Sequence, residues 1–356
     1  MKIGLITIHF QNNYGAVLQA YATQKYLSQF GEVEIIDYRY NSSVIVQNNW
    51  KYKFLQKIFK LRKLLHPFNF ILTKQKVKKF SSFRKNFFNL SNNIYFGDNS
   101  IQDNSPQYDM YICGSDQIWN TSITNNASAY FLGFTNSSNK YSFASSLGHS
   151  SMTEEEKLLA KKYLPFFKKF SVREQETAIE LNKLLNIPVQ TVLDPVFLLT
   201  KEEWLSIARP INLPKGDFIV VYAMQDNTAI ESAIEYAKTL KIPIVSIGCK
   251  LKKEDKTILT AGPQEFLYIL SKAKCVITNS FHGFAFSLIF NKKIFVCEHT
   301  IRNLRLENLL ALINMKDKQV LTQTKNIREC EIDGESAYKK LNIQDSKCYL
   351  NNIFRE

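Results

Sequence analysis

The clearest structural signal in this sequence is the stretch CVITNSFHGFAFSLIF, residues 275–290. It opens with a β-branched apolar run typical of a buried parallel strand. After a polar tip it continues into a segment with Phe, Leu and Ile on one helical face. The next apolar run, KIFVC at residues 293–297, predicts a second strand of the same kind. A strand–turn–helix unit places its tip at the carboxyl edge of a sheet, where open α/β folds bind ligands.

The tip of this unit carries the residues that suggest chemistry. Ser280, His282 and Gly283 stand where the predicted helix begins, and free backbone N–H groups at a helix start favour an anion. An ordinary βα turn, in which His282 merely caps the helix, is the alternative, and the spacing alone leaves both open.

The N-terminal half shows the same pattern. Residues 2–10 predict a strand, the polar turn at 11–15 leads into a helix over about 16–29, and residues 33–37 predict a second strand. This βαβ opening is Rossmann-like, and Gly15 permits close approach of the backbone to a ligand beside Asn13 and Tyr14. The segment lacks G-x-G-x-x-G, so a dinucleotide is not indicated.

Two further strand ends present polar side chains. The strand at 108–113 runs into Ser115, Asp116 and Gln117, and the strand at 170–174 brings Arg173 to the same edge. We interpret these as groups that face a substrate. Asp116 could equally cap a short helix.

A second βαβ series begins after Pro210, Pro214 and Gly216. It comprises strands at 218–222 and 244–247 and helices at 228–240 and 263–272, followed by the 275–297 unit. We predict an α/β protein of two Rossmann-like domains facing across a cleft, residues 1–200 and 201–356. The first carries a basic, helical insertion at about 41–97, and the C-terminal helix is a candidate to pack back on the first domain.

The overall composition is that of a globular protein. The chain has 356 residues, 45% hydrophobic and 22% charged, and this length favours two domains. No apolar run is long enough to cross a bilayer, and the N-terminus resembles a strand and not a signal peptide. The six cysteines form no C-x-x-C pair. We therefore expect a cytoplasmic protein with reduced cysteines.

The net charge of +14 is concentrated in one segment. Residues 39–96 hold 13 Lys and Arg and no Asp or Glu, and their aromatic and aliphatic residues alternate with lysines in two predicted helices broken near Pro67. A basic amphipathic segment (residues 51–85) suits the inner face of an anionic membrane. A merely solvated basic face and single-stranded nucleic acid, the less favoured partner, are the alternatives.

Five motifs, in order, together resemble the polysaccharide pyruvyl transferase family. They are I-T-I-x-x-x-x-N-Y-G-A-V-L-Q-A-Y at 6–21, CGSDQIW at 113–119, SVRE at 171–174, VLDP at 192–195 and TNSFHGFAFS at 278–287. The resemblance implies a GT-B-like fold and the transfer of an enolpyruvyl-derived group from phosphoenolpyruvate to a sugar as a cyclic ketal. It also implies an acceptor that is a surface polysaccharide or its lipid-linked precursor.

The family's phosphoenolpyruvate contacts map onto Arg173 and His282. Some members carry an arginine two residues before that histidine, where this chain has Ser280. Arg305 is a candidate replacement, and a surface helix residue is the alternative. We expect donor binding by Arg173, Ser280, His282, Gly283 and Arg305.

The expected chemistry requires proton transfer. His282 is the candidate acid and base, and Asp116 accepts a hydroxyl proton or positions the sugar. The residues expected to contact the acceptor or to line the cleft are Asn13, Tyr14, Gly15, Ser115 and Gln117. Asn13 and Tyr14 could contact either the donor or the acceptor. No cofactor beyond the donor substrate is expected. The spacing of the remaining histidines argues against a metal centre, and His9 and His149 are interpreted mainly as core residues.

Two other functions remain open at this point. One is a nucleotide-sugar glycosyltransferase on the same two-domain scaffold. The other is a non-catalytic, basic peripheral-membrane module. The first would bind a nucleotide diphosphate in place of phosphoenolpyruvate, and the second would tolerate loss of His282 and Arg173.

Overall fold

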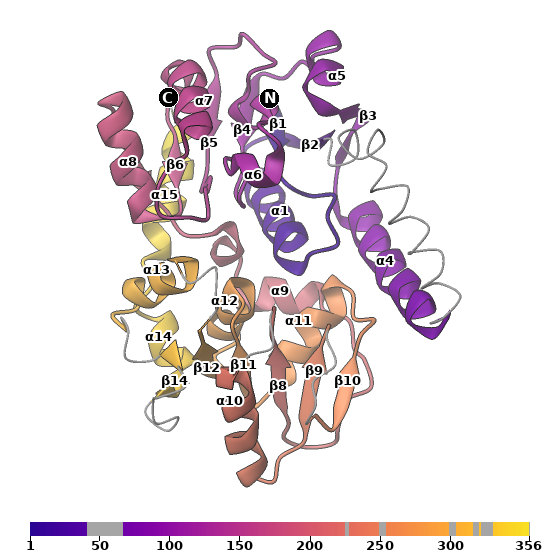
Figure 1. Ribbon diagram of the computed structural model, residues 1–356. Coiled ribbons are helices and arrows are strands. Elements are labelled where there is room, and N and C mark those ends of the chain that lie inside the picture. The colour runs from indigo at the N-terminus through magenta and orange to yellow at the C-terminus, as the bar shows by residue number, and fades with distance from the viewer. Residues whose placement is uncertain are drawn as a thin grey trace, which may run out of the picture. The chain divides into compact units, whose positions relative to one another are not determined.

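The computed structural model describes residues 1–40, 67–224, 228–248, 254–298, 304–315, 320–321 and 330–355 (Figure 1). The chain forms two compact units. The first comprises Met1–Pro195 with Asp345–Glu356, and the second comprises Val196–Gln344. The division lies a few residues before the predicted boundary at 200, and the last residues of the chain group with the first unit.

The first unit is built on a parallel five-stranded sheet of order β3-β2-β1-β4-β5. Its strands are β1 Lys2–Ile6, β2 Glu32–Arg39, β3 Leu90–Phe96, β4 Met110–Cys113 and β5 Lys140–Ser142. Two short strands, β6 Ser171–Val172 and β7 Gln190–Thr191, pair with each other. Single bridges from Tyr141 and Ser145 join β6 to the line of β5. The order in which strands are added to the sheet reverses between β1 and β4. Open α/β sheets bind ligands at such a switch point.

Strand β3 corrects the prediction of a helical insertion over residues 41–97. Residues 90–96 form the edge strand beside β2, with an irregular register between Leu90 and Ile94. The Ser-Asn-Asn sequence inside this strand hid it, because the extra residues break the alternation of apolar and polar positions that predicts a strand.

The described helices of the first unit include the one predicted over about 16–29, which begins at Tyr14. They are α1 Tyr14–Leu27, α4 Pro67–Phe87, α5 Gly97–Asp103, α6 Thr121–Thr124, α7 Glu154–Tyr163, α8 Gln175–Leu185 and most of α15 Ile343–Ile353. Helix α4 begins at Pro67, where the sequence predicted a break, because proline suits the first position of a helix. The other predicted helix of the basic segment, before Pro67, lies outside the described residues.

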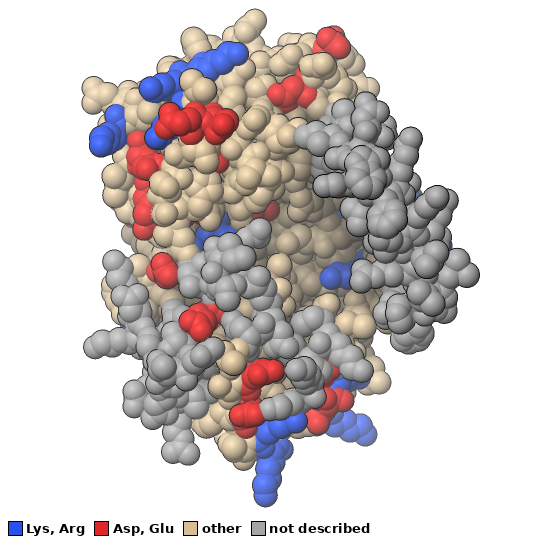
Figure 2. Space-filling model, viewed as in Figure 1, with Lys and Arg blue, Asp and Glu red and all other residues tan. Residues whose placement is uncertain are grey.

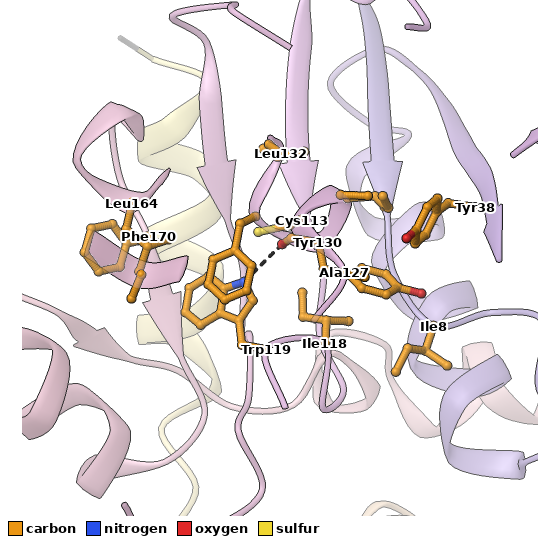
Figure 3. Packing of buried hydrophobic residues seen from close by; sticks show 14 of the residues in the cluster. Ile8, Tyr38, Cys113, Ile118, Trp119, Ala127, Tyr130, Leu132, Leu164 and Phe170 are labelled. Atoms are coloured by element: carbon orange, nitrogen blue, oxygen red, sulfur yellow. Dashed lines mark hydrogen bonds between the residues drawn. The ribbon is translucent and has the colours of Figure 1, made fainter. Parts of the chain in front are cut away.

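A cluster of large aromatic side chains fills one face of this sheet (Figure 3). The Trp119 ring stacks on Phe131 with 5.4 Å between ring centroids, and its Nε1 donates to the Tyr130 carbonyl at 3.0 Å. Trp119 is 2% exposed. The CGSDQIW motif therefore anchors the turn after β4 in the core, so the polar residues of that turn have a fixed position.

The second unit has a sheet of order β10-β9-β8-β11-β12-β13, with β14 antiparallel to β12. Its strands are β8 Ile219–Tyr222, β9 Ile244–Ile247, β10 Lys256–Ile258, β11 Cys275–Thr278, β12 Lys293–Cys297, β13 Val320–Leu321 and β14 Ile332–Asp333. Its helices are α9 Lys201–Ile207, α10 Thr228–Thr239, α11 Pro263–Lys272, α12 Phe281–Ile289, α13 Leu304–Leu312 and α14 Gly334–Tyr338. The order reverses between β8 and β11, so the 275–290 stretch lies at the switch point of this sheet.

Charged side chains are mixed over much of the described surface. On the face shown in Figure 2, acidic and basic groups lie close together in the region that α7 occupies in Figure 1. One such pair joins Lys157 Nζ to Glu154 Oε1 at 2.8 Å. Within the described part of the chain, no helix combines the length and apolar character that a bilayer span requires.

Candidate functional site

In the first unit the turn after β4 is held in a strained conformation. Asp116 has a φ of 72°, in the left-handed region that non-glycine residues rarely adopt. Its Oδ1 accepts from the Gln117 backbone N–H at 2.9 Å, and its carbonyl accepts from the Ile118 N–H at 2.8 Å. Strained backbone of this kind persists where the surrounding structure fixes it, often at functional sites.

Arg173 lies close to Asp116 in a buried charge cluster. Its Nη1 donates to Asp194 Oδ2, and its Nε lies 3.7 Å from Glu174 Oε1. Glu174 Oε1 also accepts from the Ser146 hydroxyl at 2.5 Å. Burial opposes the charged form of Arg173, but the carboxylates of Asp194, Glu174 and Asp116 outweigh it and raise the pKa of the guanidinium.

This cluster gathers the carboxyl ends of several strands. Asp116 follows β4, Arg173 and Glu174 follow β6, and Asp194 follows β7. Among the described residues, the carboxylates of Asp194 and Glu174 lie against the Arg173 guanidinium, and the charge of Asp116 acts on it as well. Such a group can fix the orientation of Arg173 and accept a proton from a hydroxyl.

Three residues predicted to contact the acceptor or line the cleft, Asn13, Tyr14 and Gly15, lie at the start of α1, after the end of β1. The Asn13 side chain caps the helix by accepting from the Ala16 N–H at 3.3 Å. Tyr14 is 2% exposed and packs on Phe80 of α4, with 5.2 Å between ring centroids. The structure thus places the Tyr14 ring in the interface between α1 and α4.

The neighbouring Ser115 and Gln117 are also buried. The Ser115 carbonyl accepts from the Thr7 hydroxyl at 2.9 Å. Gln117 lies against Gly148, whose φ is 75°, and a Cβ at Gly148 would lie 2.5 Å from Gln117 Cδ. Only glycine therefore allows this loop to close over Gln117.

The two histidines that the sequence left open differ in environment. His9 is 1% exposed; its Nε2 lies 3.1 Å from Asp37 Oδ1 and its Nδ1 lies 3.0 Å from the Thr7 carbonyl. His149 is partly exposed, and its Nε2 lies 3.0 Å from Glu156 Oε1. Burial opposes ionisation of Asp37, yet its bonds to His9 and Arg39 lower the pKa of this carboxyl to about 2.

In the second unit, Ser280 and Gly283 shape the tip between β11 and α12. Ser280 is the N-cap of α12, and its hydroxyl accepts from the Gly283 N–H at 3.4 Å. A Cβ at Gly283 would lie 2.3 Å from the Thr278 hydroxyl oxygen and 2.9 Å from the Tyr222 ring. Glycine is required here so that the helix can start directly against the two central strands.

His282 and Arg305 are brought to the same tip. The His282 ring lies 5.0 Å from the Phe281 ring, edge to face, and the side chain is 7% exposed with its residue in the first turn of α12. Arg305 of α13 lies with its Cζ 5.9 Å from the Phe281 ring centroid. Arg305 therefore lies next to Phe281, the residue between Ser280 and His282, and its role as a substitute for an arginine at 280 stays a prediction.

The predicted site residues thus form two groups, one in each unit. The first contains Asp116 and Arg173 with the nearby turns, and the second contains Ser280, His282, Gly283 and Arg305. Glu174 and Asp194 had no predicted role. Both belong to family-like motifs, SVRE and VLDP, and that membership is the signal that could have identified them. Among the described residues, no cluster of three His, Cys, Asp or Glu has the arrangement of a metal site.

Comparison with protein families decides the identity of the chain. The model of the polysaccharide pyruvyl transferase family matches residues 13–300, which is well over half of the sequence. The chain belongs to the polysaccharide pyruvyl transferase family. The family predicted from five motifs is therefore confirmed, and the protein is assigned to a family of transferases. A search of curated proteins finds no match in sequence.

Solved structures confirm the fold class of this pyruvyl transferase family member. UDP-GlcNAc 2-epimerase from Neisseria meningitidis, bound to UDP-GlcNAc, has a TM-score of 0.52 and 12% identity, with 100% of both chains covered. UDP-GlcNAc 2-epimerase from Methanocaldococcus jannaschii has a TM-score of 0.51 and 10% identity, again covering 100% of both chains. At this identity the likeness concerns the fold alone. The predicted GT-B-like class of two Rossmann-like units is confirmed.

Proposed function

We propose that this protein transfers the enolpyruvyl-derived group of phosphoenolpyruvate to a sugar, forming a cyclic pyruvate ketal during the synthesis of a surface polysaccharide. The observation that carries the proposal is the match to the pyruvyl transferase family. It is supported by the proton-transfer and oxyanion-binding groups at the carboxyl ends of both sheets.

The reaction requires protons to move in balance. Carbon C3 of phosphoenolpyruvate takes a proton, and C2 forms bonds to two sugar oxygens in turn. Inorganic phosphate leaves from C2 as the second hydroxyl closes the ring. The two hydroxyls release two protons, one replacing the proton delivered to C3 and the other leaving with the phosphate.

Each candidate residue has a role in this scheme. His282 delivers and removes protons, and Asp116 accepts a proton from the attacking hydroxyl. Arg173, Ser280, Arg305 and the backbone N–H groups near Gly283 bind the donor's carboxylate and phosphate. The turns at Asn13–Gly15 and Ser115–Gln117 hold the acceptor.

We infer that Arg173 acts as a pre-oriented group. Its bond to Asp194 and its proximity to Glu174 fix the plane of the guanidinium, so little side-chain entropy is lost when a ligand binds. Asp194 and Glu174 would then be positioning residues, and their loss would weaken donor binding through Arg173.

Phosphate release provides the direct test. Purified protein is incubated with phosphoenolpyruvate and a lipid-linked, galactose-containing oligosaccharide, and inorganic phosphate and the ketal product are measured. We expect acceptor-dependent release, reduced about 10²- to 10⁴-fold by His282→Gln. Ser232→Ala, on the exposed side of α10, is the matched control. If the wild type releases no phosphate but UDP-GlcNAc raises its melting temperature, a nucleotide-sugar transferase is favoured instead.

We further propose that the protein lies on the inner face of a membrane, bound through its basic segment and acting on a lipid-linked acceptor. Residues 51–66 of that segment lie outside the described residues. Helix α4 presents exposed Lys74, Lys78 and Lys85 with exposed Ile71 and Val77. Lysines beside apolar side chains suit the interface of an anionic bilayer.

Vesicle binding tests this part separately. The double variant Lys78→Glu, Lys85→Glu should bind phosphatidylglycerol vesicles at least 10-fold more weakly than the wild type, since each lysine is worth about 1 kcal/mol at such a surface. The double variant Lys25→Glu, Lys238→Glu, altered on α1 and α10, should bind like the wild type. Equal binding by all three proteins would exclude a role for α4.

A further inference from the structure

Two guanidinium groups flank the turn that follows β1 in the first unit. Arg39 is the last residue of β2, and Arg84 lies near the end of α4. Neither belongs to the five family motifs or to the charge cluster around Arg173. Arg39 bonds to a carboxylate, whereas Arg84 bonds to neutral groups. The positive charge of Arg84 is therefore not neutralised by a bonded acid among the described residues.

Arg39 is paired with a buried acid. Its Nε donates to Asp37 Oδ1 and its Nη2 donates to Asp37 Oδ2, both at 2.8 Å. His9 Nε2 also lies 3.1 Å from Asp37 Oδ1. Both oxygens of Asp37 are thus occupied, while the Arg39 side chain remains 38% exposed. Its guanidinium lies 5.8 Å from the Phe96 ring centroid.

Arg84 donates to neutral groups. Its Nη1 donates to the Gln11 carbonyl at 3.3 Å, and its Nη2 donates to Asn12 Oδ1 at 3.1 Å. The Gln11 side chain in turn donates to the Tyr40 hydroxyl, next to Arg39. Among the described residues, no carboxylate bonds to Arg84. Burial and the positive charge of Arg39 lower the pKa of Arg84, and Asp37 opposes this only in part.

The charge balance of this region is therefore positive. Arg39 and His9 already occupy the carboxylate of Asp37, and Arg84 bonds to neutral groups. The chain next to them cannot supply another acid, because residues 38–97 contain no Asp or Glu. Within the first unit, electrostatics thus favours an anion beside Arg39 and Arg84.

We propose that Arg39 and Arg84 form a subsite that binds a phosphate group of a substrate, next to the Gln11–Asn13 turn. Guanidinium groups present planar pairs of donors that match phosphate oxygens. Arg84 also ties α4 to this turn, so the phosphate would be held where the chain enters α1. The subsite rests on the proposed function, in which a phosphate group can come from two substrates. One is phosphoenolpyruvate, and the other is the diphosphate of a lipid-linked acceptor.

Calorimetric titration with inorganic pyrophosphate tests the subsite without any turnover. Arg84→Gln should weaken pyrophosphate binding about 10-fold or more, because it removes one charge-assisted partner. Arg84→Lys should fall between Arg84→Gln and the wild type. Arg355→Gln removes an exposed guanidinium from the same unit and should change the affinity less than twofold. Circular dichroism confirms that each variant is folded. Equal affinity of the wild type and Arg84→Gln would overturn the proposal.

Steady-state kinetics distinguish the source of the phosphate. A higher KM for phosphoenolpyruvate in Arg84→Gln, with an unchanged acceptor KM, assigns the subsite to the donor, and the reverse pattern assigns it to the acceptor diphosphate. Unchanged values for both substrates would overturn the subsite even if pyrophosphate binds. If the wild type releases no phosphate, the proposed function fails, while the pyrophosphate titration still decides whether the two arginines bind phosphate.

Discussion

Asp116 combines two properties that are usually separate, a candidate catalytic carboxylate and a left-handed backbone. Its φ of 72° would cost an ordinary L-residue about 1–2 kcal/mol. Asp and Asn tolerate this region better, because the short polar side chain bonds locally, as Oδ1 of Asp116 does to the Gln117 N–H. The residue type is therefore constrained by the backbone as well as by the chemistry.

Asparagine and alanine at position 116 should separate these two constraints. We expect Asp116→Asn to keep the free energy of unfolding within about 0.5 kcal/mol of the wild type and to lower the rate of phosphate release at least 10²-fold. Asp116→Ala should lower the rate of phosphate release as much as Asp116→Asn, and should also lower the free energy of unfolding by about 1 kcal/mol. Urea unfolding and the phosphate assay measure the two effects. Full activity in Asp116→Asn would remove Asp116 from the reaction.

His149 gives the first unit a dependence on pH. The hydrogen bond that His149 donates to the Glu156 carboxylate raises the pKa of His149 above its ordinary value of about 6.5, against the opposing effect of burial. A raised pKa in the folded state means that the protonated histidine stabilises the fold. This stabilisation is complete below pH 6.5 and is lost as the pH rises through the higher, folded-state value.

The free energy of unfolding should therefore fall between pH 6 and pH 9. Because His149 is one-third exposed, we expect it to contribute about 0.5–1 kcal/mol to this fall in the free energy of unfolding. His149→Gln should remove that contribution and leave the remaining pH dependence unchanged. Urea titrations at both pH values measure it. A wild type and a variant with the same pH dependence would show that the pair with Glu156 is not coupled to folding.

At the scale of elements, α4 has two distinct faces. Phe80 and Phe83 are fully buried against α1, where Phe83 meets Tyr21 at 5.9 Å between ring centroids. Arg84 bonds to the Gln11–Asn12 turn. Lys74, Lys78 and Lys85 are exposed, whereas Lys76 Nζ lies 5.0 Å from the Tyr14 ring centroid. The basic segment is therefore part of the folded first unit from Pro67 onward, and its inner face supports the turn at the start of α1.

Truncation of the inner face should have a large cost. We expect Phe83→Ala to lower the free energy of unfolding by about 3–5 kcal/mol, as for other buried aromatic residues. Ile71→Ala, on the same helix but 51% exposed, should change it by less than about 0.5 kcal/mol. Chemical unfolding of both variants provides the measurement. A small effect of Phe83→Ala would mean that α4 contributes little to the stability of the first unit.

The predicted elements agree best with the structure where the chain is apolar and regular. The strand at 293–297 and the helix at 263–272 have the predicted bounds. Strand β3 was missed, since its polar bulge hides the period of two. Local periodicity identifies elements whose faces differ in polarity, and it fails where an edge strand is polar on both sides.

At the scale of the whole molecule, the chain returns to its first unit. Helix α15 packs there through Tyr349, whose hydroxyl donates to the Ser142 carbonyl at 2.9 Å, and through Phe354, which stacks on Phe30 at 4.1 Å. The Ser346 hydroxyl accepts from the Leu193 N–H at 2.9 Å, close to the Arg173 partner Asp194. The C-terminal segment thus supports the strand ends that carry the charge cluster.

Loss of this packing should affect the first unit selectively. Leu350 is fully buried, so Leu350→Ala should cost about 2–5 kcal/mol. Hydrogen–deuterium exchange should rise in β1, β4 and β5 more than in β8, β9 and β11. Asn352→Ala, at an exposed position of the same helix, is the control. An increase spread evenly over both units would contradict the assignment of α15 to the first unit.

The sequence by itself determined the two Rossmann-like series, the family and most of the candidate site, because apolar periodicity and short motifs are local properties of the chain. Only the tertiary structure showed that Asp194 and Glu174 lie against Arg173, that Arg305 lies beside Phe281, and that Arg39 bonds to Asp37 while Arg84 bonds to neutral groups. Whether charges balance depends on distances across the folded chain, and no local pattern records those distances.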